Sequence, residues 1–394
     1  MHYLLYIFMA LWLCSCQGKN ARENTGTGSS IDSIDPNRNK ALFTLKDSLH
    51  DDFARYLAGL PQTRKNKFQP LEEEIFWKNY KTKMDGAWNR VTQQRLGPIA
   101  YWDSTYFSQK VIDSLPLIYP FSGPDVLHAY YLFPRVKTYV LLALEQLYDL
   151  PSLEKLNKDS RKLYFNSLEN SLRDVLSKSY FVTTHMGTDL HGERVRGVLP
   201  LLYFFVVRSG LEIRQVEQLV LDSAGVPVKS NWINTGKKVK MVKMIVRDPK
   251  TETEKTIYYI SCNLSNTGLN FTPEVMKFVD KMGPCNTFIK AASYMPHYST
   301  FKTLRDSLIS QSELIFEDDT GFPYKYFKDK KKYDVELFGE YAQPVKDFGN
   351  YAFQKDLDSV YRKDSLKIKK LGFHLGYHWG DLKQAILLVK KKPQ

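Results

Sequence analysis

The residues best suited to chemistry in this sequence surround the turn Ser122-Gly123-Pro124-Asp125, which follows the apolar run Leu117-Ile118-Tyr119. A second apolar run, Thr138 to Leu144, ends at Glu145. If the two runs are neighbouring parallel strands, Ser122, Asp125 and Glu145 share the edge of the sheet where ligands of open α/β sheets bind. The alternative is an N-cap and a tight turn that start a helix at Val126 and bind nothing.

A second polar cluster lies between two predicted helices, in the segment Thr183 to Arg194. His185, Asp189 and His191 could ligate a divalent metal, although their spacing matches no ligand signature. Polar residues in a loop between apolar helices are common at binding sites. The alternative is a surface loop that caps the helix beginning near Val195.

A third candidate is Glu317-Asp318-Asp319, three carboxylates at the end of a predicted strand. Asp318 and Asp319 suit calcium or a general acid–base pair, and a solvated turn is the favoured alternative. No Gly-x-Ser-x-Gly elbow and no His-Glu-x-x-His motif is present, so no catalytic nucleophile or zinc protease site is indicated. We expect no metal and no cofactor.

The elements that must position these residues alternate between strand and helix. This alternation predicts an α/β fold, a mixed sheet with helices on both faces, in a body spanning residues 111–394. Residues 41–110 form a helical N-terminal region that precedes it, because Leu45, Leu49, Phe53 and Leu57 recur every four residues. The expected strands are 117–119, 138–144, 212–221, 239–247, 256–264, 287–291 and 313–317. The expected helices include 126–133, 163–176, 195–208 and 300–309. A final hairpin is expected to pair Phe373 to Trp379 with Gln384 to Val389.

The first residues of the chain indicate where the protein works. The apolar run Tyr3 to Leu13 is too short to span a bilayer and suits a cleaved signal peptide. Leu13-Cys14-Ser15-Cys16 resembles the lipobox of bacterial lipoproteins, which implies removal of residues 1–15 and acylation of Cys16. Residues 16–40 are poor in large apolar side chains and suit a flexible tether. An uncleaved anchor or a buried N-terminal helix is the alternative.

Charge and cysteine content agree with an envelope location. The formal net charge of +13 suggests an anionic envelope component as a partner beside the membrane lipid, and the alternative is that the basic runs are solvated faces and ends with no partner. An exported chain is not expected to meet nucleic acid. The resemblance to lipoproteins, in which Asp after the acylated cysteine commonly implies retention in the inner membrane, implies the outer membrane for a chain with Gln17 there, with the body facing the periplasm. Cys262 and Cys285 would be the two remaining thiols, and an oxidising compartment predicts a disulfide between them, with two buried thiols as the alternative.

Two resemblances concern the body. A turn after the first strand and an acidic residue, Glu145, after the second resemble the first half of the S-adenosylmethionine-dependent methyltransferases at the level of the fold. The glycine-rich turn of that class is replaced by Gly123 and Pro124, and an exported protein has no ready supply of the cofactor. The segment Tyr119-Pro120-Phe121-Ser122-Gly123-Pro124-Asp125 is similar to one in an uncharacterised group of bacterial proteins, which implies no activity.

The sequence therefore favours an outer-membrane-tethered, periplasm-facing lipoprotein that binds an envelope component or serves as an accessory factor. The alternative is an extracytoplasmic hydrolase that acts on a glycan or phosphoester through clustered carboxylates. The hydrolase requires at least two of these carboxylates and one histidine to converge on a single pocket, whereas scattered carboxylates favour a binding protein.

The Cys16→Ala variant is expected to lose acylation and membrane attachment, because the sequence offers no second apolar run of bilayer length. Fractionation of cells that produce the variant, with a high-salt wash of the membranes, measures this. A variant that still sediments with the washed membranes would contradict the lipoprotein interpretation.

Overall fold

The parallel strands of the sheet determine how the rest of the chain is arranged. The structure is a computed structural model and describes residues 48–393 except 182–194, 233–234, 237, 346–347, 349–351, 364 and 379–382. In these described residues the sheet has ten strands in the order β4-β3-β5-β6-β2-β1-β7-β8-β10-β9. The strands are β1 (Leu117–Pro120), β2 (Thr138–Ala143), β3 (Glu212–Leu221), β4 (Pro227–Lys229), β5 (Lys240–Asp248), β6 (Thr253–Ser261), β7 (Cys285–Ile289), β8 (Ser312–Asp318), β9 (Tyr333–Gly339) and β10 (Ala385–Lys391).

The five central strands run parallel, and the strands that follow β1 in the sequence are added first on one side of it and then on the other. From β1 the chain goes outward to β2 and then to β6, and all three strands are parallel. It then returns to the other side of β1 for β7 and continues outward to β8, again in parallel. The boundary between β1 and β7 is therefore a topological switch point, where the loops after the two strands diverge and leave a crevice.

Antiparallel strands extend the sheet on both sides of this parallel centre. The strands β3, β5 and β6 pair antiparallel, and the short β4 pairs antiparallel with β3. At the other side β10 lies between β8 and β9 and runs antiparallel to both. The sheet is therefore mixed.

One face of the sheet is covered by helices from the first half of the chain. The helix α8 is apolar on every side, and all of its residues are buried in the core. Stacking of Tyr56 on Trp77 and an edge contact of Tyr56 with Phe165 join three further helices. The six helices of this face are α2 (Ser48–Leu57), α3 (Ile75–Val91), α4 (Gly97–Thr105), α5 (Val126–Leu132), α6 (Lys158–Lys178) and α8 (Leu199–Arg208).

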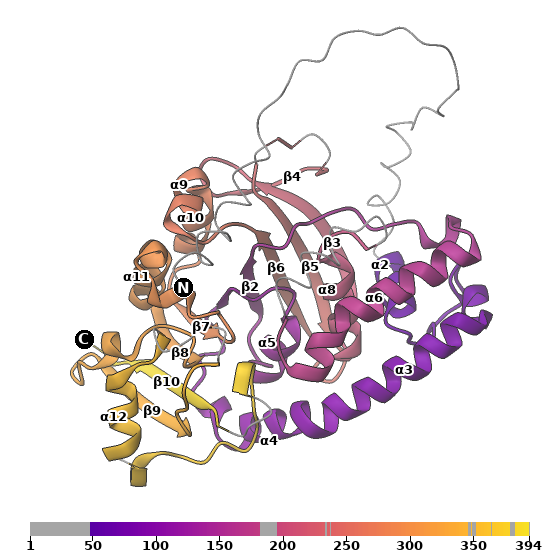
Figure 1. Ribbon diagram of the computed structural model, residues 1–394. Helices are drawn as coiled ribbons and strands as arrows, with labels where there is room; N and C mark the ends of the chain where they lie inside the picture. The colour runs from indigo at the N-terminus through magenta and orange to yellow at the C-terminus, as the bar shows by residue number, and fades with distance from the viewer. Residues whose placement is uncertain are drawn as a thin grey trace, which may run out of the picture. The chain divides into compact units, whose positions relative to one another are not determined.

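The opposite face is covered by helices from the second half, as Figure 1 shows. Side chains alternate along the strands, so that Leu141 packs in the core of the first face and Leu142 in the core of the second. Both faces are thus buried. The helices of the second face are α9 (Asn266–Phe271), α10 (Glu274–Lys281), α11 (Lys302–Gln311) and α12 (Lys355–Lys363).

The expected α/β fold with helices on both faces and helices before the sheet is confirmed, including the parallel unit β1-α5-β2 and the hairpin of β5 with β6. The expected C-terminal hairpin is wrong. Residues 373–378 hold a short 3-10 helix, Gly376–His378, and β10 pairs with β8 and β9 instead. The reason is that an aromatic, alternating sequence describes a buried loop as well as a strand.

The expected disulfide is also wrong, because Cys262 and Cys285 are both free and buried. Cys262 follows the last residue of β6, whereas Cys285 is the first residue of β7. Since β6 and β7 run in the same direction and β2 and β1 lie between them, the two thiols are at opposite ends of the parallel strands. Among the described residues, no helix is long and apolar enough to cross a membrane.

A buried carboxyl group on α4 makes the fold sensitive to pH. Asp103 is 6% exposed and its Oδ1 has no hydrogen-bond partner. Burial raises the pKa of Asp103 to about 6 from its ordinary value of 3.8, so the folded protein holds this proton more tightly than the unfolded chain does. The stability that comes from the protonated carboxyl is present below about pH 4 and is lost as the pH rises through about 6.

Asp103→Asn is therefore expected to raise the free energy of unfolding by about 1 to 3 kcal/mol at pH 8 and to change it little at pH 4. Urea denaturation of both proteins across this pH range measures the difference. Asp334→Asn, at an exposed position, is the matched control and should leave the profile unchanged. A pH-independent effect of Asp103→Asn would contradict the assignment.

Candidate functional site

Two adjoining cavities lie at the carboxyl ends of β1, β2, β6 and β7, at the switch point of the sheet. Their volumes are about 80 and 50 Å³. Residues from the ends of three strands line both of them, namely Phe121, Gly123, Glu145 and Ala291. The larger cavity is mainly apolar, and Asp125, Lys290 and Tyr180 line the smaller one.

The rim of the cavities is built from residues in a left-handed backbone conformation. The φ angles are 58° for Phe121, 51° for Ala291, 51° for Ser293 and 55° for Tyr294. Each such non-glycine residue costs about 1 to 3 kcal/mol, and strain of this kind gathers at ligand sites. Four of the six non-glycine residues with positive φ in the described part of the chain lie in the loops after β1 and β7.

Asp125 lies at the centre of a buried polar network behind the rim. Its Oδ1 accepts a hydrogen bond from the backbone N of His128 at 3.1 Å and lies 2.8 Å from the Nδ1 of His128. Its Oδ2 accepts from the hydroxyl of Tyr119 at 3.0 Å and lies 2.8 Å from the Nζ of Lys290. None of these four side chains is more than 3% exposed.

The charge distribution in this network follows from burial and proximity. Burial lowers the pKa of His128 to about 4, so the imidazole is neutral at pH 7. Burial alone would raise the pKa of Asp125, but His128 and Lys290 outweigh it and hold that pKa well below its usual range. The pKa of Lys290 is lowered by burial, and Asp125 opposes the shift. A buried ion pair of Asp125 with Lys290 results.

This ion pair connects three elements of the fold. Asp125 is the N-cap of α5, which begins at Val126 as expected. Lys290 directly follows β7 and also donates to the carbonyl oxygen of Ser179, 2.5 Å away, at the C-terminal end of α6. Because both oxygens of Asp125 are engaged, the carboxylate positions the rim and is not available to activate a water molecule.

Asp318 and Asp319 at the end of β8 support the rim from the other side. Asp318 accepts a hydrogen bond from the backbone N of Ala291 at 2.9 Å, and Asp319 accepts one from the hydroxyl of Tyr294 at 2.8 Å. Burial and the neighbouring Asp318 raise the pKa of Asp319 to about 7. Both side chains are at most 4% exposed, so the solvated turn considered for them is wrong.

Glu145 is the carboxylate that lines both cavities. It directly follows Leu144 at the end of β2, and the hydroxyl of Tyr259 lies 3.3 Å from its Oε2. Burial raises the pKa of Glu145. Its position beside an apolar cavity allows it to accept hydrogen bonds from a ligand hydroxyl.

The structure brings Ser122, Asp125 and Glu145 together around one cavity, as the sequence predicted. His185, Asp189, His191 and Cys16 lie outside the described residues. Among the described residues no group of three or more His, Cys, Asp or Glu side chains could hold a metal ion. Sequence reasoning missed Tyr119, His128, Lys290 and Tyr294.

The geometry defines the class as an α/β protein with a crevice at the switch point of a largely parallel sheet. The described structure keeps the two features on which the resemblance to methyltransferases was based, a turn after β1 and an acidic residue after the adjacent β2. No family model and no curated protein sequence matches the chain.

Removing one member of the ion pair is expected to destabilise the protein strongly. Asp125→Asn and Lys290→Met should each lower the free energy of unfolding by about 3 to 5 kcal/mol, because each leaves one buried charge without its partner. The double variant should lose at least about 1 kcal/mol less than the sum of the two. Urea denaturation of the four proteins measures the coupling, and additive losses would contradict it.

Proposed function

We propose that the protein is a lipid-anchored envelope protein whose α/β body binds a sugar ring with vicinal hydroxyl groups in the crevice at the β1–β7 switch point. The observation that carries this proposal is that Glu145 lies on the wall of an otherwise mainly apolar cavity. A carboxylate can accept hydrogen bonds from two adjacent hydroxyl groups, and an acidic residue after the second strand binds ribose in this manner in doubly wound folds.

The wall beside Glu145 suits the less polar face of a ring. Phe301 and Phe121 meet edge to face, with ring centroids 5.6 Å apart, and both line the larger cavity. Leu144, Leu264 and Met295 complete the apolar surface. Its volume of about 80 Å³ restricts the ligand to one compact group, since drug-sized ligands occupy about 300 to 1,000 Å³.

Phosphate is disfavoured in this crevice. The turn after β1 has one glycine followed by Pro124, which has no backbone N–H to donate. Asp125 places a carboxylate at the start of α5, and the Lys290 cation is paired with it. A neutral sugar ring therefore fits better than a nucleotide phosphate or a dinucleotide.

The hydrolase alternative receives less support from the same geometry. Asp125 and Glu145 do line one cavity, and His128 contacts Asp125. However, both oxygens of Asp125 are engaged by Tyr119, Lys290 and His128, and Asp318 accepts hydrogen bonds from two loop backbones. Among the described residues that line the crevice, Glu145 then remains as a single carboxylate, and glycoside hydrolysis requires an acid and base pair.

The location of this binding function is proposed from the N-terminal sequence. Leu13-Cys14-Ser15-Cys16 and the following polar residues support a lipid anchor at Cys16 with a tether to the body. A protein anchored in this way in the outer membrane, facing the periplasm, would meet sugar rings in envelope glycans and in nucleosides. An accessory role in handling such an envelope component follows from this location.

Calorimetric titration with adenosine and with N-acetylglucosamine tests the proposal and distinguishes a nucleoside from an envelope glycan as the source of the ring. Glu145→Gln is expected to weaken binding of the preferred ligand at least about tenfold, because one of two acceptor oxygens is lost. Its melting temperature should remain near that of the parent protein.

Glu254→Gln is the matched control. It makes the same chemical change at an exposed position near the start of β6. This position lies at the opposite end of the parallel strands from Glu145, so the variant should leave binding unchanged. Failure of both ligands to bind the folded parent protein would overturn the proposal, and so would equal binding by the parent protein and the Glu145→Gln variant.

A further inference from the structure

The segment after α12 holds a leucine side chain fully in solvent. Leu366, in the 3-10 helix Ser365–Lys367, is 101% exposed, which is more than any other large hydrophobic residue in the described part of the chain. A single exposed leucine is ordinary on a protein surface, so its surroundings decide whether it has a role.

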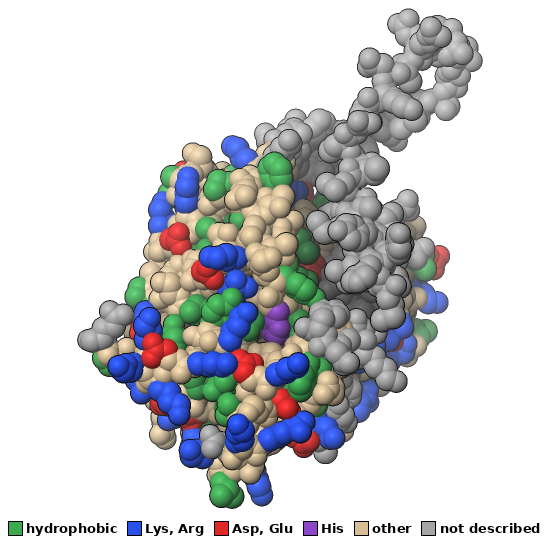
Figure 2. Space-filling view, turned by 60° about the vertical axis from the view of Figure 1, so that its left-hand side comes forward, with side chains coloured by type: hydrophobic (Ala, Val, Ile, Leu, Met, Phe, Trp, Pro, Cys, Tyr) green, Lys and Arg blue, Asp and Glu red, His purple; other side chains and the backbone are tan. Residues whose placement is uncertain are grey.

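Basic residues flank Leu366 in the sequence. Residues 362–370 contain five basic residues and one acidic residue, and all five basic residues are exposed. Figure 2 shows many Lys and Arg side chains, with several Asp and Glu side chains among them, next to hydrophobic ones on the lower part of the face that carries the C-terminal elements. The five basic residues are Arg362, Lys363, Lys367, Lys369 and Lys370.

The backbone on both sides of Leu366 is fixed to the body. On one side, Leu357 and Tyr361 of α12 are buried, and the hydroxyl of Tyr361 donates to the carbonyl oxygen of Phe338 at 2.8 Å. On the other side, Lys369 donates its backbone N–H to the carbonyl oxygen of Leu337 and accepts one from Gly339, both at 2.9 Å. The leucine is therefore held outward between two anchored segments.

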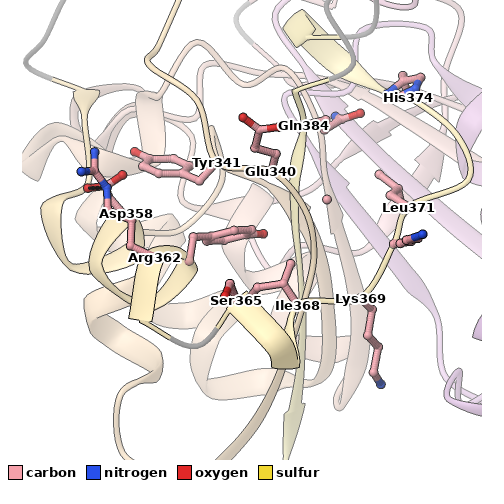
Figure 3. A pocket seen from close by; sticks show the side chains of 13 residues that line it. Glu340, Tyr341, Asp358, Arg362, Ser365, Ile368, Lys369, Leu371, His374 and Gln384 are labelled. Atoms are coloured by element: carbon pink, nitrogen blue, oxygen red, sulfur yellow. Dashed lines mark ion pairs between the residues drawn. The ribbon is translucent and has the colours of Figure 1, made fainter.

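A cavity lies beside this segment. Its volume is about 680 Å³, and Arg362, Ser365, Ile368, Lys369 and Lys370 contribute to its lining together with Tyr341 and Tyr361. Figure 3 shows Tyr341 and Arg362 on one side of it and His374 and Gln384 toward the other. Glu340 and Asp358 also line it, and Asp358 pairs with Arg362 at 2.9 Å. The cavity thus offers room for a polar headgroup next to the exposed leucine.

We propose that residues 362–370 dock on the surface of a membrane that contains anionic phospholipid. Leu366 enters the boundary between headgroups and acyl chains, while Lys363, Lys367 and Lys370 lie against headgroup phosphates. The positive charge of residues 362–370 complements the negative surface of such a membrane, and this complementarity favours the membrane as the partner. The proposal deepens the envelope role and relies on the proposed lipid anchor only for proximity to a membrane, and it does not depend on the sugar site.

Co-sedimentation with phosphatidylcholine vesicles, made with and without phosphatidylglycerol, tests the docking. The full chain carrying Cys16→Ala serves as the parent protein, so that no acyl chain contributes to binding. Its binding should increase when phosphatidylglycerol is present and decrease at high salt. Leu366→Ser and the double variant Lys367→Glu/Lys370→Glu should each reduce the phosphatidylglycerol-dependent bound fraction at least about fivefold at unchanged melting temperature.

Phe271→Ser is the matched control, because Phe271 is 83% exposed but ends α9, in a segment where Glu274 is the nearest charged residue. It should bind vesicles as the parent protein does. The proposal is overturned if the parent protein binds both kinds of vesicle equally, or if the Leu366 and lysine variants bind as the parent does. It is also overturned if inorganic phosphate removes vesicle binding at equal ionic strength, since the segment would then be a site for free anions. A loss for Phe271→Ser as large as that for Leu366→Ser overturns it as well.

Discussion

The buried ion pair of Asp125 with Lys290 is the interaction on which the crevice depends. Moving two charges from water into the interior is expensive, and it is tolerated only where further hydrogen bonds complete their coordination. Tyr119, His128 and the carbonyl oxygen of Ser179 provide these bonds. The result fixes the start of α5, the end of β7 and the end of α6 relative to one another, which allows four non-glycine residues to remain in left-handed conformations.

The separation of roles among the carboxylates follows from this arrangement. The carboxylates of Asp125, Asp318 and Asp319 accept hydrogen bonds that hold the loops after β1 and β7 in place. Glu145, which follows β2, instead lines both cavities. Carboxylates that are close together in the sequence therefore need not form a ligand-binding site together. On the surface, too, position decides the role, because the basic residues of 362–370 have the exposed Leu366 between them.

Local sequence pattern predicted the fold well where burial imposes a period. The strands β1 and β2, the hairpin of β5 with β6 and the buried α8 follow from apolar runs and turns. The site was predicted in part, since Ser122, Asp125 and Glu145 do meet, and His128 could have been found three residues after the N-cap. Lys290 could not, because only the return of the chain to the other side of β1 brings it to Asp125. The disulfide and the last hairpin failed because cysteine content and alternation carry no information on strand direction.

The order of the strands also has a kinetic consequence. β1 pairs with β7, which is synthesised only after β2, the strands β3 to β6 and the helices α6, α8, α9 and α10. Contacts between segments so distant along the chain form slowly, and until they form one edge of β1 is unpaired and the carboxylate of Asp125 lacks its ion pair with Lys290. A nascent chain would therefore expose an unpaired strand until residue 290 has been synthesised. Such a nascent chain would benefit from a chaperone that covers β1 during this interval.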